Sequence, residues 1–532
     1  MTRRRFNLAT RNSGVLRYLV LSLVMPAVLS IGLSAQVVLF PEQKDYNVWL
    51  RTENPVSIGI VTMPDIGRTG FDAKSTYGDF HKAMESGGIN SCGFNSSGYK
   101  SLKPLNLWGS FKFSQERHRD RRWSDNINPY NGNPYLTGSS VKGKYSYQVF
   151  DFSVKMSSKR LFGFMWAGIG LDYSLGDFSR LQDPRSRTQE IRYSITPGVA
   201  FRLGKETIGM NVRYGYSKEK IGSYVSKSKD SKEYLLYLQE GFGVYSTHVS
   251  NDYERRIESW RYGVALQYGH SFCGNAALLA EVSPYYRSDL VTDAKMATPG
   301  NYKESGADIS MEVSFGNWTA NSALSLTSGA ANKISQKAVT VIDPSSGVTS
   351  TRYETIFSIK SYVLQSLKGE VGLSYVAMGD EITEFGKWNA GCKLRFGGRS
   401  EEYIYYSPSS SFGCVNVFPS VHGGGTLFDR NGHRLALNGE LSYRINVADR
   451  FSISDELKNK VALDNVVKPD HEIMTSDYMR TSADLLYVFP LSIRQIGKRL
   501  SGFVSLSVNM ALASGFQGSG RNVFGISVGV FH

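Results

Sequence analysis

The chain has 532 residues, a formal net charge of +14 and a mean hydropathy of −0.27. After the first 35 residues, no stretch supplies the roughly 20 consecutive apolar residues that a membrane-spanning helix needs, which argues against a helical membrane protein. A transmembrane β-barrel stays open, because its alternating strands barely change an average hydropathy.

Residues 1–35 are predicted to be a signal peptide. They begin with a basic stretch that has no acidic residue, continue with an apolar run and reach small residues just before Gln36. Removing the five arginines of this segment lowers the net charge from +14 to +9. An uncleaved N-terminal anchor is the alternative.

Residues 36–68 are predicted to form a periplasmic or lumenal segment ahead of the barrel. The stretch NVWLRTENPVSIG, residues 47–59, is apolar in part but lacks the period of a strand. Pro55 locks its own φ and restricts Asn54. We expect Trp49, Asn54 and Pro55 to belong to a hatch that partly closes the lumen. A flexible leader is the alternative.

Apolar and polar residues alternate along EIRYSITPGVAFRLGKETIGMNVRYGY, residues 190–216. This period of two indicates strands with unlike faces. The pattern recurs along the chain, in residues 105–113, 164–175, 260–269, 308–315, 387–396, 434–447 and 502–512.

The connections between these stretches alternate between short turns and long polar segments, which is typical of outer-membrane barrels. Residues 69–532 are therefore predicted to form an all-β fold, a transmembrane antiparallel β-barrel of about 18 strands, with a range of 14–20. Its short turns would be periplasmic and its long loops, among them 177–188 and 331–350, extracellular. The last alternating stretch, residues 522–532, resembles the C-terminal insertion signal of such barrels.

In this reading the apolar face of each strand meets lipid and the polar face lines the lumen. The candidate lumen-lining residues are Lys112, Arg192, Arg202, Arg213, Lys393, Arg395 and Arg444. Acidic residues at equivalent positions nearly balance them, so a salt-bridged network and a selective pore are both open.

A basic segment, residues 114–123, carries Arg117, Arg119, Arg121 and Arg122. One hypothesis is a loop that binds the phosphates of lipopolysaccharide or another acidic ligand. The alternative is a solvated loop whose arginines pair with neighbouring acidic residues.

Two stretches resemble known families. RLQDPRSRTQEIRYSITPGVAFRLG, residues 180–204, is similar to a family of outer-membrane barrels of Bacteroidota that is catalogued as a domain of unknown function. VWLRTENPVSIG, residues 48–59, more distantly resembles the hook of barrels of the fatty-acid-transporter type, although Val56-Ser57 replaces the usual Ala-Gly. The resemblance implies the outer membrane of a Gram-negative bacterium, but no reaction.

Catalytic and metal-binding motifs are lacking in the sequence. None of the eight histidines has the spacing of metal ligands or lies in a hydrolase motif, and the four cysteines are far apart. We therefore expect no enzyme, cofactor, metal or nucleic-acid partner. The predicted function is passive or gated passage of a small molecule across the outer membrane. The alternative is a non-transporting scaffold that binds a partner protein there, and membrane lipid and lipopolysaccharide are expected contacts.

Overall fold

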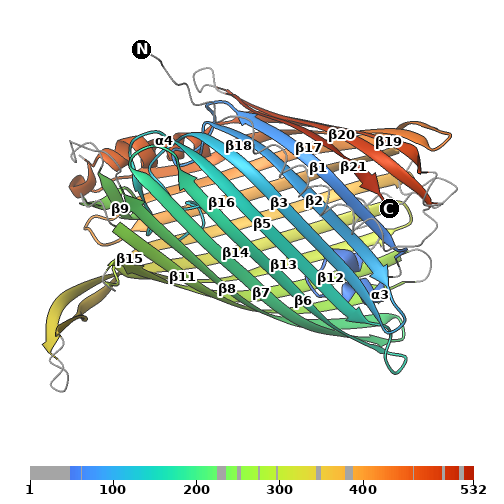
Figure 1. Ribbon diagram of the computed structural model, residues 1–532, viewed down its shortest axis with the longest axis horizontal. Helices are drawn as coiled ribbons and strands as arrows, with labels where there is room; N and C mark the ends of the chain where they lie inside the picture. The colour runs from blue at the N-terminus through green and yellow to red at the C-terminus, as the bar shows by residue number, and fades with distance from the viewer. Residues whose placement is uncertain are drawn as a thin grey trace, which may run out of the picture.

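The computed structural model describes residues 48–61, 63–224, 235–248, 253–272, 276–294, 297–342, 349–377, 388–458, 460–493, 498–514 and 520–532. The predicted signal peptide and residues 36–47 lie outside these ranges. Figure 1 shows that the described chain forms one barrel of long, tilted strands.

The barrel wall is a single sheet of 18 antiparallel strands in which each wall strand pairs with the next one along the chain. Pairing of the first and last wall strands, with Arg68 opposite Phe531, closes the sheet. Closure removes both sheet edges, so every strand has a partner on each side. The predicted fold class and strand number are confirmed. The wall strands are β1 (Ile66–Tyr77), β2 (Gly88–Ser101), β3 (Leu105–Arg121), β5 (Gly143–Ser158), β6 (Met165–Arg180), β7 (Arg185–Leu203), β8 (Glu206–Tyr224), β11 (Tyr253–Ser271), β12 (Ala276–Asp293), β13 (Gly300–Phe315), β14 (Trp318–Ile342), β15 (Thr349–Ala377), β16 (Trp388–Tyr403), β17 (Ser410–Arg430), β18 (His433–Ser452), β19 (Tyr478–Ile493), β20 (Lys498–Ala513) and β21 (Gly520–Phe531).

Two segments predicted to be long loops differ in the structure. Residues 177–188 are mostly strand, and only 181–184 separate β6 from β7. Residues 331–350 largely continue β14 and β15 as a paired hairpin, because the alternation extends beyond the barrel rim after a bulge at Ala331/Asn332. We call residues 332–342 and 349–360 the arm, which projects from the barrel in Figure 1.

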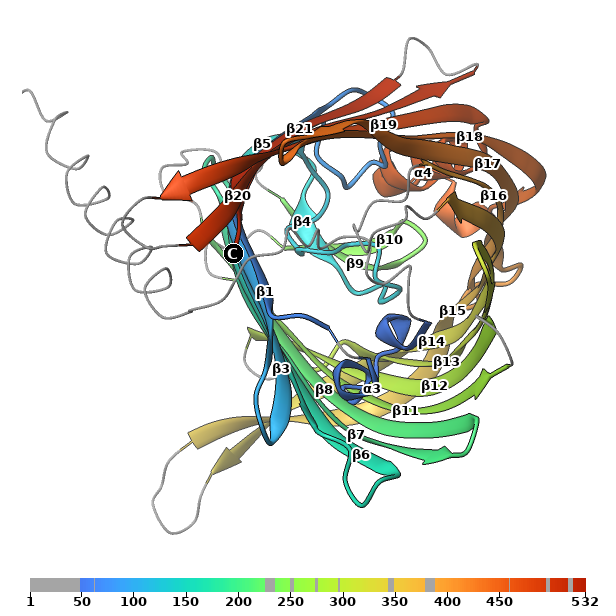
Figure 2. The same ribbon diagram turned by 90° about the vertical axis from the view of Figure 1, so that its right-hand side faces the viewer.

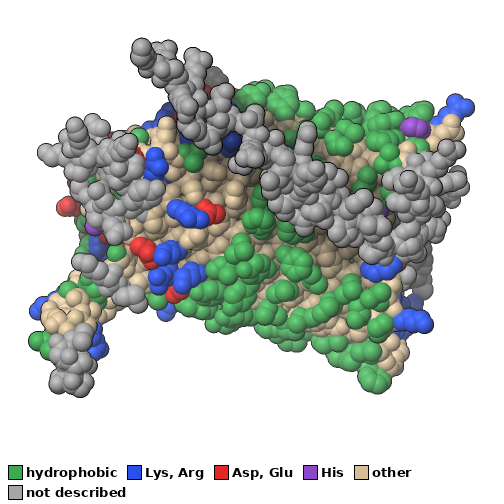
Figure 3. All heavy atoms as spheres, in the orientation of Figure 1, with side chains coloured by type: hydrophobic (Ala, Val, Ile, Leu, Met, Phe, Trp, Pro, Cys, Tyr) green, Lys and Arg blue, Asp and Glu red, His purple; other side chains and the backbone are tan. Residues whose placement is uncertain are grey.

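The outer surface carries an apolar belt. Along β8, Ile208, Met210 and Val212 are exposed, whereas Asn211 between them is buried on the lumen side. The same alternation on the other strands produces the hydrophobic surface visible in Figure 3. This is the arrangement of a barrel whose outer face meets lipid.

The two ends of the barrel differ. The start of β1 and the end of β21 both lie at the short-turn end of the barrel. There Gly67 and His532 exchange backbone hydrogen bonds of 2.7 and 2.9 Å. Here η1 (Val48–Arg51) and α3 (Ser57–Ile60) lie inside the ring of strands, as Figure 2 shows. No helix among the described residues is long and apolar enough to cross a membrane.

At the long-loop end the connecting segments fold into the lumen. They include a three-stranded sheet, β4 (Thr137–Ser139), β9 (Leu236–Gly241) and β10 (Val244–His248), and the helices η4 (Asp455–Leu457), η5 (Leu463–Val467) and α4 (Lys468–Thr475). We call residues 79–87, 122–142, 235–248 and 453–477 the loop cap. Figure 2 shows its strands and α4 within the ring of wall strands.

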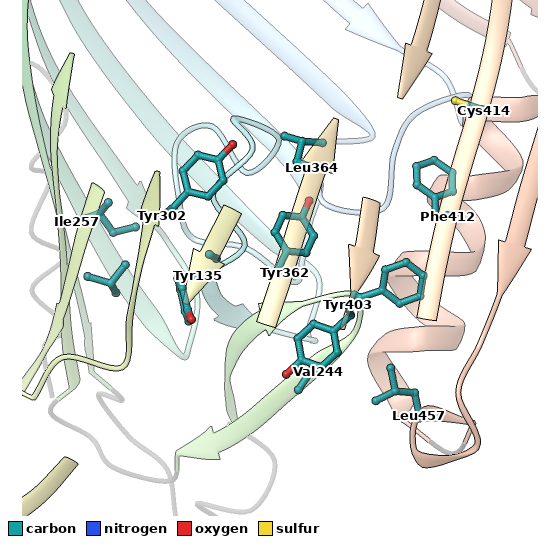
Figure 4. Close-up of a cluster of buried hydrophobic side chains, with 13 residues drawn as sticks. Tyr135, Val244, Ile257, Tyr302, Tyr362, Leu364, Tyr403, Phe412, Cys414 and Leu457 are labelled. Carbon is teal, nitrogen blue, oxygen red and sulfur yellow. The ribbon is translucent and has the colours of Figure 1, made fainter. Parts of the chain in front are cut away.

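A hydrophobic core joins the loop cap to the wall. Tyr135, Phe242 and Leu457 from the cap pack with inward-facing residues of β11 to β17, such as Tyr302 and Tyr362. Figure 4 shows Tyr135, Tyr302 and Tyr362 among the strands, and Leu457 beside a helix. Because burial of such aromatic residues is favourable by about 1.5–3 kcal/mol each, the cap is a packed element rather than a set of solvated loops.

Candidate functional site in the barrel lumen

Residues 48–61, which we call the lumenal segment, are attached to the wall through Asn54. Its side chain is fully buried, and its Nδ2 donates to Gln267 Oε1 at 2.9 Å and to the carbonyl oxygens of Val199 and Met210 at 3.3 and 3.2 Å. Its Oδ1 accepts a 3.1 Å hydrogen bond from the Val56 backbone N–H. One side chain therefore connects the segment to β7, β8 and β11.

The wall provides space for this contact through Gly198 on β7. A Cβ atom at Gly198 would overlap Asn54 Oδ1 and lie 3.0 Å from Pro55 Cδ. Any larger side chain would therefore displace the Asn54-Pro55 pair, which explains why the smallest residue stands at this position of the strand. Pro55 and Asn54 thus contact the same stretch of wall.

Ion pairs and apolar contacts hold the rest of the lumenal segment. Glu53 accepts hydrogen bonds of 2.7 and 2.9 Å from Arg213 on β8, and Arg51 lies 2.6 Å from Glu312 on β13. Trp49 is nearly buried and packs in a cluster with Leu279 of β12. The segment therefore follows one side of the lumen, and its contacts extend from Tyr99 on β2 to Glu312 on β13.

Three of the seven predicted lumen-lining cations have acidic partners. Arg395 pairs with Glu370 at 3.5 Å and with Glu440, while Arg192 lies 3.7 Å from Glu190. Arg213 pairs with Glu53, as described above. Acidic neighbours therefore neutralise these three lumen charges. This is the salt-bridged network that the sequence left open beside a selective pore.

The other four cations have different surroundings. Arg444 donates to the Ser476 carbonyl at 2.8 Å and so supports the end of α4, and Arg202 donates to the Gly204 carbonyl in a short turn. Lys112 and Lys393 occupy inward-facing positions of β3 and β16 and form no ion pair with a described residue. The seven residues thus do not converge on one site.

The prediction that residues 114–123 form a basic loop is wrong. Residues up to Arg121 belong to β3, because the alternation of Phe111 and Phe113 continues into the basic stretch. Arg121 is buried and donates to backbone carbonyls of the loop cap, including that of Ser124 at 3.1 Å. Arg117 and Arg119 are exposed, and Arg122 follows the strand. The four arginines therefore have separate surroundings and do not form one ligand-binding loop.

The loop cap contains a small cavity that sequence reasoning missed. Its volume is about 100 Å³, and its lining includes Lys82, Tyr130, Arg399 and Asp470. Lys82 Nζ lies 4.3 Å from the centre of the Tyr130 ring, a cation–π contact, and forms no ion pair with a described residue. The sequence shows that the loops contain many aromatic residues, but it does not show which of these residues contact each other in the folded cap.

Asp470 ties three parts of the cap together. Its carboxylate accepts hydrogen bonds from the Ala83 backbone N–H at 2.7 Å and from the Tyr130 hydroxyl at 2.8 Å. Burial raises the pKa of Asp470 to about 6, although both hydrogen bonds and nearby Lys82 oppose that shift. The carboxyl group is therefore poised near neutral pH at the contact between α4 and two other loops.

Among the described residues, no group of three or more His, Cys, Asp or Glu side chains could hold a metal ion. Of the cysteines, Cys92 and Cys392 are exposed, Cys414 is buried in the cap core, and all three are free. Cys273 lies outside the described residues.

Comparison with known proteins places the chain in a family. The family model described as "Family of unknown function (DUF6850)" matches residues 55–532. The chain belongs to this family. No curated protein matches the sequence. The DUF6850 assignment agrees with the expected membership in a barrel family of unknown function.

Several solved structures resemble this DUF6850 member in fold. The copper transporter OprC is 9% identical, with a TM-score of 0.40 and coverage of 88% of this chain and 81% of its own. The FrpB iron transporter from Neisseria meningitidis is 10% identical, with a TM-score of 0.39 and coverage of 90% and 83%. The siderophore receptor PirA from Pseudomonas aeruginosa is 8% identical, with a TM-score of 0.33 and coverage of 88% and 81%.

The description of the matched family names no transporter, so the distant resemblance that the Asn54-Pro55 hook suggested stays a prediction. The closed 18-stranded wall and its apolar outer belt identify the DUF6850 chain as an outer-membrane β-barrel by their own geometry.

Proposed function

We propose that this barrel provides gated passage for a small polar solute across the outer membrane of a Gram-negative bacterium, with the lumenal segment as its hatch. One observation carries the proposal. A segment ahead of the first strand lies inside the lumen at the short-turn end and is fixed there by Asn54. A chain that only led into the barrel would gain nothing from a buried asparagine with partners on three strands.

The contacts of the segment suit a hatch, because several are polar and reach into the lumen. The side chains of Glu53 and Arg213 are 49% and 29% exposed, so their ion pair is partly hydrated. Such pairs contribute about 0–1 kcal/mol, which lets them break and re-form at little cost. Burial of Trp49 and Val56 favours the seated position. The hatch is therefore closed at rest and releasable.

The charges of the lumen side chains affect which solutes can pass through the barrel. The pairing of Arg395 with Glu370 and Glu440 leaves no strong field of one sign on that wall. A lumen with balanced charges discriminates by size and hydrogen bonding more than by net charge. A small neutral or zwitterionic solute is therefore the expected cargo class.

Conductance in planar bilayers tests the proposal. Removing residues 36–60 is expected to give a larger and steadier channel than the full mature chain gives. Glu312→Gln in the full chain is the matched control, since it weakens one contact of the segment but keeps Asn54 in place. Equal conductance of the truncated and full chains, or none from either, would contradict the hatch.

A second function, a scaffold that binds a partner protein, is favoured by the arm. The arm projects past the rim of the barrel, and its apolar residues Ile342 and Ile356 are 63% and 64% exposed. Apolar side chains on a projecting hairpin are typical of contact sites. A photo-crosslinking residue at 342 should give an adduct of one defined mass in cells, whereas the same residue at 371 on the outer belt should not. Identical patterns from both positions would remove this alternative.

A further inference from the structure

We propose that the outer face of β3, β5, β7 and β8, at the long-loop end, binds the phosphate groups of a phosphorylated lipid of the outer leaflet. This site lies outside the lumen and goes beyond the proposed passage function. Figure 3 shows Lys and Arg side chains gathered on this face, beside the apolar belt.

The order of outward-facing residues along β8 sets the depth of the site. Ile208, Met210 and Val212 come first, then Tyr214 and Tyr216, and then Lys218 and Lys220. Aromatic residues of this kind mark the boundary between the acyl chains and the headgroups. The two lysines, two and four positions beyond that boundary, therefore lie at headgroup level.

The aromatic boundary is continuous across three strands. Tyr193 on β7 lies 5.6 Å from Tyr216 on β8, and Tyr216 lies 5.8 Å from Trp260 on β11, measured between ring centroids. The contact of Tyr214 with Tyr262, at 5.6 Å, runs beside them. This band fixes one interface level for all three strands.

The neighbouring strands repeat the order. On β3 the outward residues Phe111 and Phe113 are followed by Arg117 and Arg119, and on β5 Lys144 lies at the same end of the strand. All three basic residues are exposed, and none forms an ion pair with a described residue. Their charges are therefore available to a ligand.

Other cations of the face already have one acidic neighbour each. Lys218 lies 3.2 Å from Glu258, Lys220 lies 2.9 Å from Glu254, and Arg187 lies 2.6 Å from Asp177. The unpaired Arg117, Arg119 and Lys144 thus give the face its excess positive charge. Charge-assisted hydrogen bonds from arginine and lysine suit phosphate oxygens.

The far side of the barrel differs. There the outward residues of β13 to β18 line a shallow hollow of about 730 Å³, and many of them are small, including Ser305, Ala307, Ser400 and Gly413. Arg450 also lines this hollow and Lys303 is exposed on β13, but no aromatic residue is among the lining residues. Unpaired cations just above an aromatic boundary therefore distinguish the face of β3 to β8, and they point to an anionic ligand held at membrane depth, which is a lipid headgroup.

The test uses the folded full mature chain in nanodiscs of zwitterionic lipid. Binding of diphosphorylated lipid A is measured by native mass spectrometry for wild type, for the triple variant Arg117→Gln/Arg119→Gln/Lys144→Gln, and for the matched control Lys303→Gln/Lys360→Gln/Arg450→Gln. The control removes three exposed cations from other positions. Heat-modifiable migration verifies that each variant is folded.

The triple variant should bind about tenfold to a hundredfold more weakly and lose most of its salt dependence, whereas the control should bind like wild type. Wild type should prefer diphosphorylated to dephosphorylated lipid A by a similar factor, and inorganic phosphate should compete poorly. Equal binding by the triple variant, equal loss in the control, or full competition by free phosphate would overturn the proposal. So would retention of an acidic protein on this face in place of the lipid.

Discussion

Asn54 Nδ2 and Gln267 Oε1 are joined by a hydrogen bond of 2.9 Å, although 213 positions separate the two residues in the chain. Gln267 in turn donates to Asn211 at 2.7 Å and to Glu281 at 2.9 Å, so Asn54 enters a network that spans β8, β11 and β12. The lumenal segment is thereby coupled to the wall at a buried polar point, where loss of one partner leaves others unsatisfied.

Replacing Asn54 with Ala should loosen the lumenal segment and leave the barrel intact. The change removes the three donated hydrogen bonds and leaves Gln267 Oε1 without one donor, which costs about 1–3 kcal/mol. Trypsin should then cleave after Arg51 several times faster, while heat-modifiable migration stays the same. Thr52→Ala is the control, because Thr52 Oγ1 bonds only within the segment, to the Trp49 carbonyl. Equal cleavage rates for Asn54→Ala and wild type would contradict this role.

Because alternate residues of β8 face lipid, we expect a charged substitution at an outward position of β8 to destabilise the barrel. Val212 is 44% exposed on the outer face, so Val212→Arg would place a charge in lipid and should destabilise the barrel by about 2–4 kcal/mol near the midplane. Val212→Ala keeps the face apolar and should be tolerated. Urea unfolding in vesicles measures both variants.

Cysteine labelling checks the same register independently. A cysteine at position 212 should react with lipid-soluble reagents, and one at position 213, where Arg213 contacts Glu53, with water-soluble reagents. The reverse pattern would mean that the strand is shifted by one residue.

Protonation of Asp470 should stabilise the loop cap as the pH falls. Its pKa is raised from 3.8 in the unfolded chain to about 6 in the cap, so the folded cap binds the proton more tightly. The resulting stabilisation is fully present below about pH 4, is lost as the pH rises through about 6, and amounts to about 3 kcal/mol. Lys82, Glu85 and Tyr130 are the charged or titratable groups nearby that shape this shift.

Hydrogen exchange of residues 463–475 measures this effect. Between pH 7 and pH 4, after correction for the intrinsic rate, protection of these amides should rise in wild type. Asp470→Asn carries no titrating carboxyl group and should show a nearly flat profile. A flat profile in wild type, or the same slope in the variant, would show that another group controls the cap.

The wall was predictable from the sequence and the loop cap was not. The 18 strands follow from a local period of two, which lipid on one side and water on the other impose on each strand. Burial of Trp123, Tyr135 and Phe242 instead depends on contacts between segments more than 100 positions apart, such as the hydrogen bond from Gln239 to the Trp123 carbonyl. Nothing local distinguishes these aromatic residues from exposed ones.

The same limit applies to the candidate site. The lack of strand period and the Asn54-Pro55 pair indicated a lumenal segment, but its partners on β7, β8 and β11 depend on barrel closure. In the sequence Arg117 and Arg121 belong to one basic segment, but in the structure they lie at different positions along β3 and their side chains point to different sides of the wall. Arg117 is exposed on the outer face, and Arg121 is buried under the loop cap.

The last strand should control assembly. β21 pairs with β20 on one side and with β1 on the other, so it closes the sheet. Phe524 and Val528 are exposed on the lipid face of β21, whereas Phe531 is buried against Phe503 with 4.8 Å between their ring centroids. Replacing both Phe524 and Val528 with Asp would place two charges in lipid and leave β1 without a stable partner.

We therefore expect Phe524→Asp/Val528→Asp to reduce outer-membrane levels of the protein strongly and to abolish heat-modifiable migration. Ser527→Lys is the matched control, because Ser527 belongs to the same strand but alternates to the lumen side, where it lies opposite Asp72 on β1 and a positive charge is hydrated and compensated. Deleting His532 should have a smaller effect in the same direction, since it removes the two backbone hydrogen bonds with Gly67 but leaves the packing of Phe531. Normal levels of the double variant, or a loss as large in Ser527→Lys, would show that closure does not depend on the lipid face of β21.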